Sequence, residues 1–89
     1  MRRLDGTRVL VTGATSGLGL AMADALVDAG ARVAVSGRSR ARAESVAVRL
    51  GSSAVGLELD VRDERSVQQS VDQLYERWGG LDVLVNNAG

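Results

Sequence analysis

The stretch from Val9 to Gly19 constrains the fold more than any other part of this chain. It reads Val-Leu-Val-Thr-Gly-Ala-Thr-Ser-Gly-Leu-Gly, a short apolar run followed at once by a glycine-rich turn. Such a run is typical of a strand that is covered on both faces in a parallel sheet. Glycines at positions 13, 17 and 19 suit a tight turn, a close approach to a ligand, and the packing of a helix on its strand.

A helix that opens at such a turn directs unpaired N–H groups and the positive end of its dipole at one point. That point suits a pyrophosphate. The plainer interpretation is a turn that only joins two elements, and a glycine triplet by itself does not decide between the two. The decision therefore depends on the rest of the chain.

Strand-like and helix-like segments alternate along the chain. In order, the expected elements are 8–12, 17–29, 31–36, 40–50, 55–59, 64–78 and 81–85. Alternation of this kind predicts an α/β fold, a Rossmann-type doubly wound parallel sheet with strand order 3-2-1-4, truncated after strand 4. Right-handed crossovers then put the first two helices on one face and the third on the other.

Apolar residues at helical spacing predict the buried side of each helix. For the first helix these are Leu18, Met22, Ala25, Leu26 and Ala29, with Ala21 and Ala25 small enough for close packing. Trp78 lies on the apolar stripe of the third helix, so we interpret it as core rather than as a surface for stacking a nucleotide. Asp63 is the expected N-cap of that helix.

Composition narrows the function classes. The 89 residues suffice for one domain, 45% are hydrophobic, and the formal net charge is zero, which gives no electrostatic reason to expect nucleic acid or a membrane surface as partner. No apolar run approaches the roughly 20 residues of a membrane span. The chain has neither Cys nor His, so we predict no disulfide and no metal site, and a cytoplasmic location is the simplest expectation.

Arg38 marks the end of the second expected strand. A site for an unphosphorylated dinucleotide usually has Asp or Glu there, on the ribose hydroxyls, whereas this chain has Gly37 and then Arg38. A guanidinium pairs with a 2′-phosphate through charge-assisted hydrogen bonds, and Ser16 and Ser39 add hydroxyl donors. We therefore predict preference for NADP(H), with NAD(H) as the alternative cofactor. The competing interpretation is a solvated arginine that starts a helix.

Polar residues also follow the third and fourth expected strands. Asp60 can accept a hydrogen bond from an adenine amino group, or it can cap the turn before the next helix. Asn86 and Asn87 both donate and accept through their amides. For these two, tying the strand to neighbouring backbone competes with contact to a ligand.

Three motifs together resemble a known family. The stretch from Thr12 to Gly19 is similar to the T-G-x-x-x-G-x-G motif of short-chain dehydrogenases/reductases, and Asp60-Val61 and Asn86-Asn87-Ala88-Gly89 resemble two further motifs of that family. The resemblance covers the whole chain. It implies that residues 13–19 hold the pyrophosphate and adenosine ribose and that Arg38 contacts the 2′-phosphate. The expected cofactor-binding residues are Gly13, Thr15, Ser16, Gly17, Leu18, Gly19, Arg38, Ser39, Asp60, Val61, Asn87, Ala88 and Gly89.

In that family Asp60 and Val61 would border the adenine, and the segment from Asn87 to Gly89 would lie toward the nicotinamide ribose. The family's catalytic Ser, its Tyr-x-x-x-Lys pair and its catalytic Asn all follow the N-N-A-G motif, so we assign no catalytic residue. Tyr75 is followed four positions later by Gly79, and the chain contains no Lys.

The favoured hypothesis is the N-terminal, cofactor-binding half of an oxidoreductase that moves hydride between a nicotinamide cofactor and a carbonyl or alcohol, inactive in isolation. On this view residues 1–89 form one dinucleotide-binding domain, incomplete at its C-terminal end. The alternative is a stand-alone nucleotide-binding or regulatory module. Because strand 4 would be an apolar edge, we also expect self-association or a missing C-terminal half as its partner.

Overall fold

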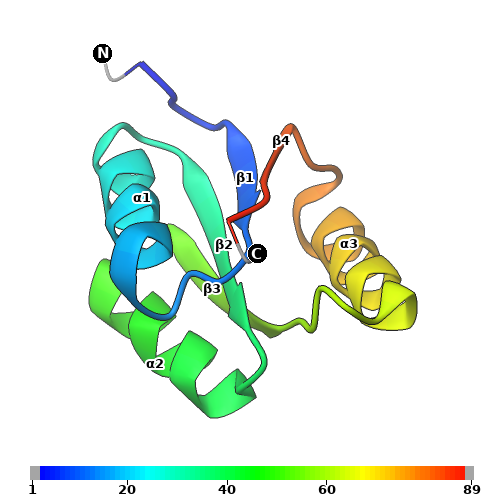
Figure 1. Cartoon of the computed structure of the whole chain (residues 1–89). Helices are drawn as coiled ribbons and strands as arrows, with labels where there is room; N and C mark the ends of the chain where they lie inside the picture. The colour runs from blue at the N-terminus through cyan, green and yellow to red at the C-terminus, as the bar shows by residue number, and fades with distance from the viewer. Residues whose placement is uncertain (1–2, 88–89) are drawn as a thin grey trace.

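The computed structural model describes residues 3–87, and its strands form one parallel sheet between two layers of helices (Figure 1). The elements are β1 (Arg8–Val11), α1 (Gly17–Asp28), β2 (Arg32–Gly37), α2 (Arg40–Leu50), β3 (Ala54–Glu58), α3 (Glu64–Trp78) and β4 (Val83–Val85). The strand order is β3-β2-β1-β4, with every neighbouring pair parallel. The predicted fold class and strand order are confirmed.

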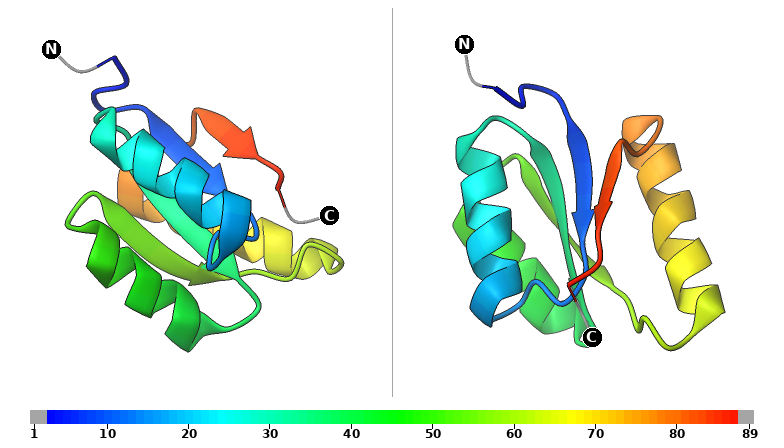
Figure 2. Two further views of the ribbon diagram at one scale, coloured as in Figure 1. Left: turned by 60° about the vertical axis from the view of Figure 1, so that its left-hand side comes forward. Right: turned by 45° about the horizontal axis from the view of Figure 1, so that its top comes forward.

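The helices are distributed over the two faces as expected. Helices α1 and α2 cover one face of the sheet and α3 covers the other, which the right-hand view of Figure 2 shows along the edge of the sheet. Side chains alternate along β1, so Val9 and Val11 point to the α1 and α2 layer while Leu10 points to the α3 layer. Each face thus has its own apolar core, and Leu74 of α3 is fully buried in the second.

The predicted buried side of α1 is wrong in part. Leu18 is 68% exposed, and Ala21 and Ala25 are also exposed, whereas Gly19 and Ala23 are the buried positions. Partly buried residues of this helix that pack on the core are Leu20, Met22, Leu26 and Val27. Spacing of apolar residues missed this orientation because Gly19, which has no side chain to count, faces the sheet at the start of the helix.

Helix α3 follows the prediction closely. The Asp63 carboxylate accepts from the Arg65 N–H at 3.0 Å, which confirms the N-cap. Trp78 is partly buried against the second core, in agreement with its interpretation as a packing residue, while Tyr75 is exposed. Within the described part of the chain, none of the three helices is long and apolar enough to cross a membrane.

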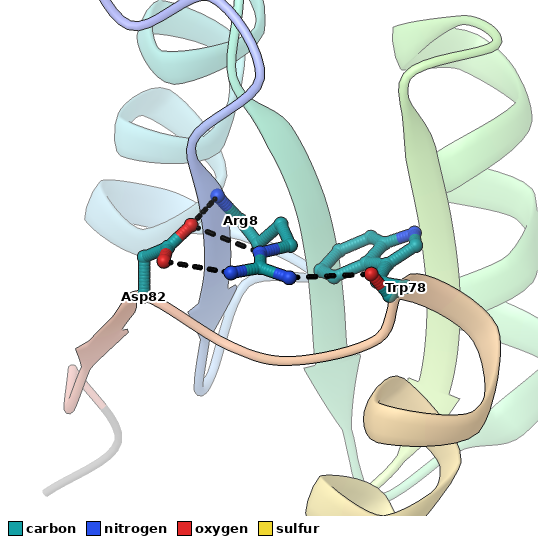
Figure 3. Close-up of polar contacts among 3 residues, drawn as sticks. All are labelled: Arg8, Trp78 and Asp82. Atoms are coloured by element: carbon teal, nitrogen blue, oxygen red, sulfur yellow. Dashed lines mark hydrogen bonds and ion pairs between the residues drawn. The ribbon is translucent and has the colours of Figure 1, made fainter.

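At the amino end of the sheet an arginine and an aspartate that are 74 residues apart form an ion pair (Figure 3). The Arg8 guanidinium donates to both Asp82 oxygens at 3.0 Å and to the Trp78 carbonyl at 3.3 Å, and the Arg8 backbone N–H donates to Asp82 at 2.8 Å. These contacts connect β1, the end of α3 and the approach to β4. They lower the pKa of Asp82 to about 2, mainly through the side-chain hydrogen bond from Arg8.

Strand β4 is a short edge strand. It pairs with β1 on one side, and Val83 and Leu84 are 43% and 53% exposed. Of the expected strand 81–85 only Val83–Val85 form the strand. Asp82, just before it, donates its backbone N–H to the Arg8 carbonyl at 2.9 Å and accepts from Arg8 through its carboxylate. The predicted apolar edge is therefore present in the described residues.

Candidate nucleotide-binding site

The glycine turn adopts a conformation that requires glycine. Gly13 and Gly17 have φ values of +62° and +58°, in the left-handed region that other L-residues rarely occupy. A Cβ added to Gly19 would meet the Gly13 carbonyl oxygen and lie 2.6 Å from the Asn87 amide nitrogen. Close approach of α1 to the end of β1 therefore depends on the missing side chain.

Asn87 fastens this turn to the end of β4. Its amide Nδ2 donates to the Gly13 carbonyl at 3.1 Å, and its backbone N–H donates to the Thr12 hydroxyl at 3.0 Å. The Thr12 hydroxyl lies 3.2 Å from Asn86 Oδ1 and donates to it. These contacts fit the interpretation that the asparagines tie strand to backbone, while the expected sites Ala88 and Gly89 lie outside the described residues.

The start of α1 differs from the starts of the other two helices. Ser39 and Asp63 cap α2 and α3 with side-chain oxygens, but Ser16, in the same position before α1, makes no side-chain cap. As in α2, the first turn of α1 holds no acidic residue. Helix N–H groups without a partner and an uncompensated dipole favour an anion. The sequence thus leaves one helix start open, at the glycine turn.

A hollow of about 460 Å³ lies beside that turn, at the carboxyl ends of β1, β2 and β3. Its lining combines small residues, apolar residues and three charged ones, namely Gly13, Thr15, Gly37, Arg38, Leu59, Asp60, Val61 and Arg62. A side chain at Gly37 would come within 3.0 Å of Thr15 Cγ2, so glycine keeps this side of the hollow open. Five predicted site residues are brought together here.

A second hollow of about 470 Å³ adjoins the first, since Thr15 and Arg38 line both. Ser39 and Arg42 complete its lining. Ser39 also caps α2 by accepting from the Arg42 N–H at 3.2 Å, which is a structural role beside the predicted one. Ser16 and Leu18 are exposed and do not line either hollow, and Gly17 lines a separate hollow between α1 and α2.

Asp60 is held by its neighbour Arg62. The Arg62 side chain donates to both carboxylate oxygens at 3.0 Å, and its backbone N–H donates to one of them at 3.0 Å. These hydrogen bonds, with the charges of Arg62 and, more weakly, Arg38, lower the pKa of Asp60 to about 2. Asp60 therefore does form the turn before α3, and its carboxylate also lines the first hollow.

Two arginines of the site escaped the sequence analysis. Arg42 follows Arg38 by four residues, which is one helical turn, so the spacing contained the signal. Arg62 follows Asp60 by two residues in a turn, where an aspartate often accepts from the backbone N–H two positions on. The sequence pattern therefore also allowed the pairing of Arg62 with the Asp60 carboxylate to be predicted.

The glycine turn and the charged hollows together fit a dinucleotide. An uncapped helix start follows a buried strand, and the hollows continue along the carboxyl edge to β3, which is the arrangement of dinucleotide-binding α/β proteins. Among the described residues no group of acidic side chains forms a metal site.

Comparison with known proteins identifies the family. The family model described as short chain dehydrogenase matches residues 7–89, so the chain belongs to the short-chain dehydrogenases. The predicted resemblance is confirmed, and with it the oxidoreductase class of the chain's relatives.

Curated relatives match nearly the whole chain. A sorbitol dehydrogenase of Cereibacter sphaeroides is 44% identical over 86 residues, covering 97% of this chain and 34% of the relative. A 3-oxoacyl-(acyl-carrier-protein) reductase FabG of Aquifex aeolicus is 40% identical over 91 residues, covering 98% of this chain and 37% of the relative. The chain thus spans about a third of the length of these relatives.

A solved structure matches the fold. The 3-ketoacyl-(acyl-carrier-protein) reductase of Brucella melitensis, crystallised in complex with NADH, superimposes with a TM-score of 0.86 at 36% identity. The match covers 91% of this chain and 33% of that chain. It supports a nicotinamide dinucleotide as the cofactor class.

Proposed function

We propose that this chain is the NADP(H)-binding half of a short-chain dehydrogenase/reductase that transfers hydride between the nicotinamide cofactor and a carbonyl or alcohol substrate. The observation that carries the proposal is Arg38, which lines both hollows at the end of β2, where Asp or Glu would select an unphosphorylated ribose. Within residues 3–87, Arg38 has no hydrogen-bond or ion-pair partner, so its guanidinium is available to a phosphate.

The second hollow supports the phosphorylated cofactor further. Two arginines, Arg38 and Arg42, line this hollow together with the hydroxyl-bearing residues Thr15 and Ser39, and no carboxylate lines it. A guanidinium and a hydroxyl are the donors that a 2′-phosphate needs. The Brucella melitensis structure holds NADH, so the preference rests on these residues of the chain itself.

Each of the remaining predicted site residues is assigned to one part of the dinucleotide. We assign the pyrophosphate to the turn from Gly13 to Gly19, the adenine to Asp60 and Val61, and the approach to the nicotinamide ribose to residues 87–89. When bound, the cofactor supplies or accepts the hydride. The residues of this chain bind it and fix its orientation.

We assign no hydride-transfer residue within these 89 residues. No Lys occurs in the chain, and Tyr75 is exposed on α3 and followed by Gly79 at the position of the lysine in Tyr-x-x-x-Lys. We further propose that residues 1–89 form one dinucleotide-binding domain, incomplete at its C-terminal end and located in the cytoplasm. Because Val83 and Leu84 are exposed, we propose that a second copy or a C-terminal half covers the β4 edge.

Titration of the 89-residue chain with NADPH and NADH, followed by a turnover assay with a panel of carbonyl compounds, tests the proposal. We expect binding, tighter for NADPH, and no turnover. Turnover would overturn the proposal that these residues bind the cofactor without catalysing the reaction, and an absence of binding in a sample that circular dichroism shows to be folded would overturn the cofactor-binding function. A natural continuation that lacks a Ser and a Tyr-x-x-x-Lys would favour the stand-alone nucleotide-binding module.

A further inference from the structure

The first hollow contains a carboxylate close to the arginine that is to bind a phosphate. Asp60 and Arg38 line the same hollow, and the Arg38 charge contributes to the low pKa of Asp60, so the two groups interact electrostatically. An unpaired carboxylate at this position would attract the Arg38 guanidinium and would repel a dianionic phosphate. A site for a 2′-phosphate therefore needs a way to neutralise Asp60.

Arg62 provides that neutralisation. Its Nε and Nη2 atoms donate to the two Asp60 oxygens at 3.0 Å each, a bidentate geometry that is the strongest an arginine forms with a carboxylate. The pair is local, since the residues are two apart, and the Arg62 side chain is 71% exposed. It therefore contributes little to holding distant elements together, and its clearest effect is on the charge of the hollow.

We infer that Arg62 is a specificity-determining residue, which neutralises Asp60 and leaves Arg38 free for the phosphate of a 2′-phosphorylated nucleotide. The inference rests on the proposed function. It assigns a role to a residue that need not touch the ligand. Charges across a solvated hollow are screened, so the effect is about threefold to fivefold in affinity rather than several orders of magnitude.

The probes are adenosine 2′,5′-bisphosphate and adenosine 5′-monophosphate, which differ only in the 2′-phosphate. Dissociation constants are measured by calorimetry at low salt for the chain and for Arg62→Gln. We expect Arg62→Gln to weaken the bisphosphate about threefold to fivefold more than the monophosphate, and Arg62→Lys, which keeps the charge, to retain most of the discrimination. The matched control is Arg65→Gln, an exposed arginine in the first turn of α3 that lines neither hollow and is expected to change neither constant.

A second variant separates neutralisation from direct contact. In an Asp60→Asn background no carboxylate competes for the Arg38 guanidinium, so Arg62→Gln removes only the screened attraction of its own charge for the phosphate, and we expect a smaller effect on the bisphosphate than in the unmodified chain. If the effect is as large in that background, Arg62 acts on the phosphate directly and the inference is wrong. Equal weakening of both probes by Arg62→Gln would also overturn it, because that result indicates a structural role.

The two proposals fail in different ways. If the unmodified chain binds the bisphosphate no better than the monophosphate, the proposed NADP(H) preference is wrong and the role of Arg62 falls with it. If the unmodified chain discriminates but Arg62→Gln discriminates equally well, only the role of Arg62 is wrong.

Discussion

The two ends of the sheet each carry a bidentate arginine–aspartate pair, and the two pairs differ in the elements that they connect. Arg8 and Asp82 are 74 residues apart and join β1 to the approach to β4, whereas Arg62 and Asp60 are two residues apart at the rim of a hollow. Both aspartates have a pKa lowered to about 2 by their arginine. The same kind of pair therefore joins distant elements of the fold at one end, whereas at the other end we propose that it sets the charge of a binding site.

The difference lies in what surrounds each pair. At the amino end the Arg8 guanidinium also donates to the Trp78 carbonyl, so its N–H groups are used in hydrogen bonds within the protein. At the carboxyl end Arg38 has no partner within residues 3–87 and Ser16 leaves the start of α1 uncapped. Changes at the amino end should alter stability, and changes at the carboxyl end should alter binding.

The largest effect on stability is expected from Gly19→Ala. The added Cβ meets the Gly13 carbonyl oxygen and the Asn87 amide, and overpacking of this kind costs about 1–3 kcal/mol. That exceeds the gain of about 0.5–1 kcal/mol from replacing a helical glycine by alanine. We expect a lower free energy of unfolding in urea, and a loss of NADPH affinity greater than the loss of folded protein explains.

Gly56→Ala is the matched control for Gly19→Ala. Its Cβ would lie 2.5 Å from the Ala43 carbonyl carbon, so it also overpacks a helix against a strand, but Gly56 lines neither hollow at the carboxyl edge. Its folded fraction should bind NADPH normally. If both variants lose affinity only in proportion to unfolding, the glycine turn has no special role in binding.

Arg38→Asp is expected to reverse the cofactor preference. It removes charge-assisted hydrogen bonds worth about 1.5–3 kcal/mol and puts a like charge beside the 2′-phosphate, so the NADPH to NADH affinity ratio should fall by about tenfold to a hundredfold. Thermal stability should change little, since Arg38 is exposed. Fluorescence titration with both cofactors measures the ratio, and an unchanged ratio would contradict the assignment.

At the amino end, Asp82→Asn is expected to lower stability and to leave cofactor affinity unchanged. Because the pKa of Asp82 in the fold, about 2, lies below its ordinary value of 3.8, its stabilising contribution is present above that value and is lost as the pH falls toward 2. The difference between the chain and Asp82→Asn in urea unfolding should therefore shrink over this range.

Asp60→Asn provides the comparison for Asp82→Asn. Its pKa is lowered to the same value, but a pair two residues apart can also form in the unfolded chain. We expect a smaller loss of stability than for Asp82→Asn. An equal or larger loss would contradict the division of roles between the two ends.

The smallest effect is expected at the β4 edge, from Leu84→Lys. Leu84 is 53% exposed on an edge strand, and a lysine there discourages pairing between sheets. We expect sedimentation velocity to show less self-association for the variant at equal concentration. A chain that is monomeric before substitution would contradict the expected association.

Periodicity and glycine placement were sufficient to predict the fold of this chain. The alternation of elements predicts a parallel sheet, the strand order is the usual one of doubly wound folds, and crossover handedness then places the helices on the two faces. The turn at 13–19 has a pattern that few other structures require. The orientation of α1 was not predicted, because Gly19 has no side chain to contribute to the apolar pattern and yet packs closely against Gly13. As a result Leu18 was expected to be buried, whereas it is exposed in the structure.

The site was predictable only in outline. Arg38, Asp60 and Val61 were placed at strand ends by the sequence pattern, and the structure brings them into one hollow. Arg62 was missed because its role depends on the pairing of its side chain with Asp60, which the residue types alone do not specify. Ser39 illustrates the opposite case, since a residue singled out for a ligand also caps a helix.

Amide hydrogen exchange of the 89-residue chain with and without NADPH tests most directly whether ligand binding is confined to the carboxyl end of the sheet. We expect NADPH to slow exchange in the segments 13–20, 37–42 and 59–62, with no change around Arg8 and Asp82. Protection centred on the amino end, or none at saturating NADPH, would contradict the assignment of the two ends.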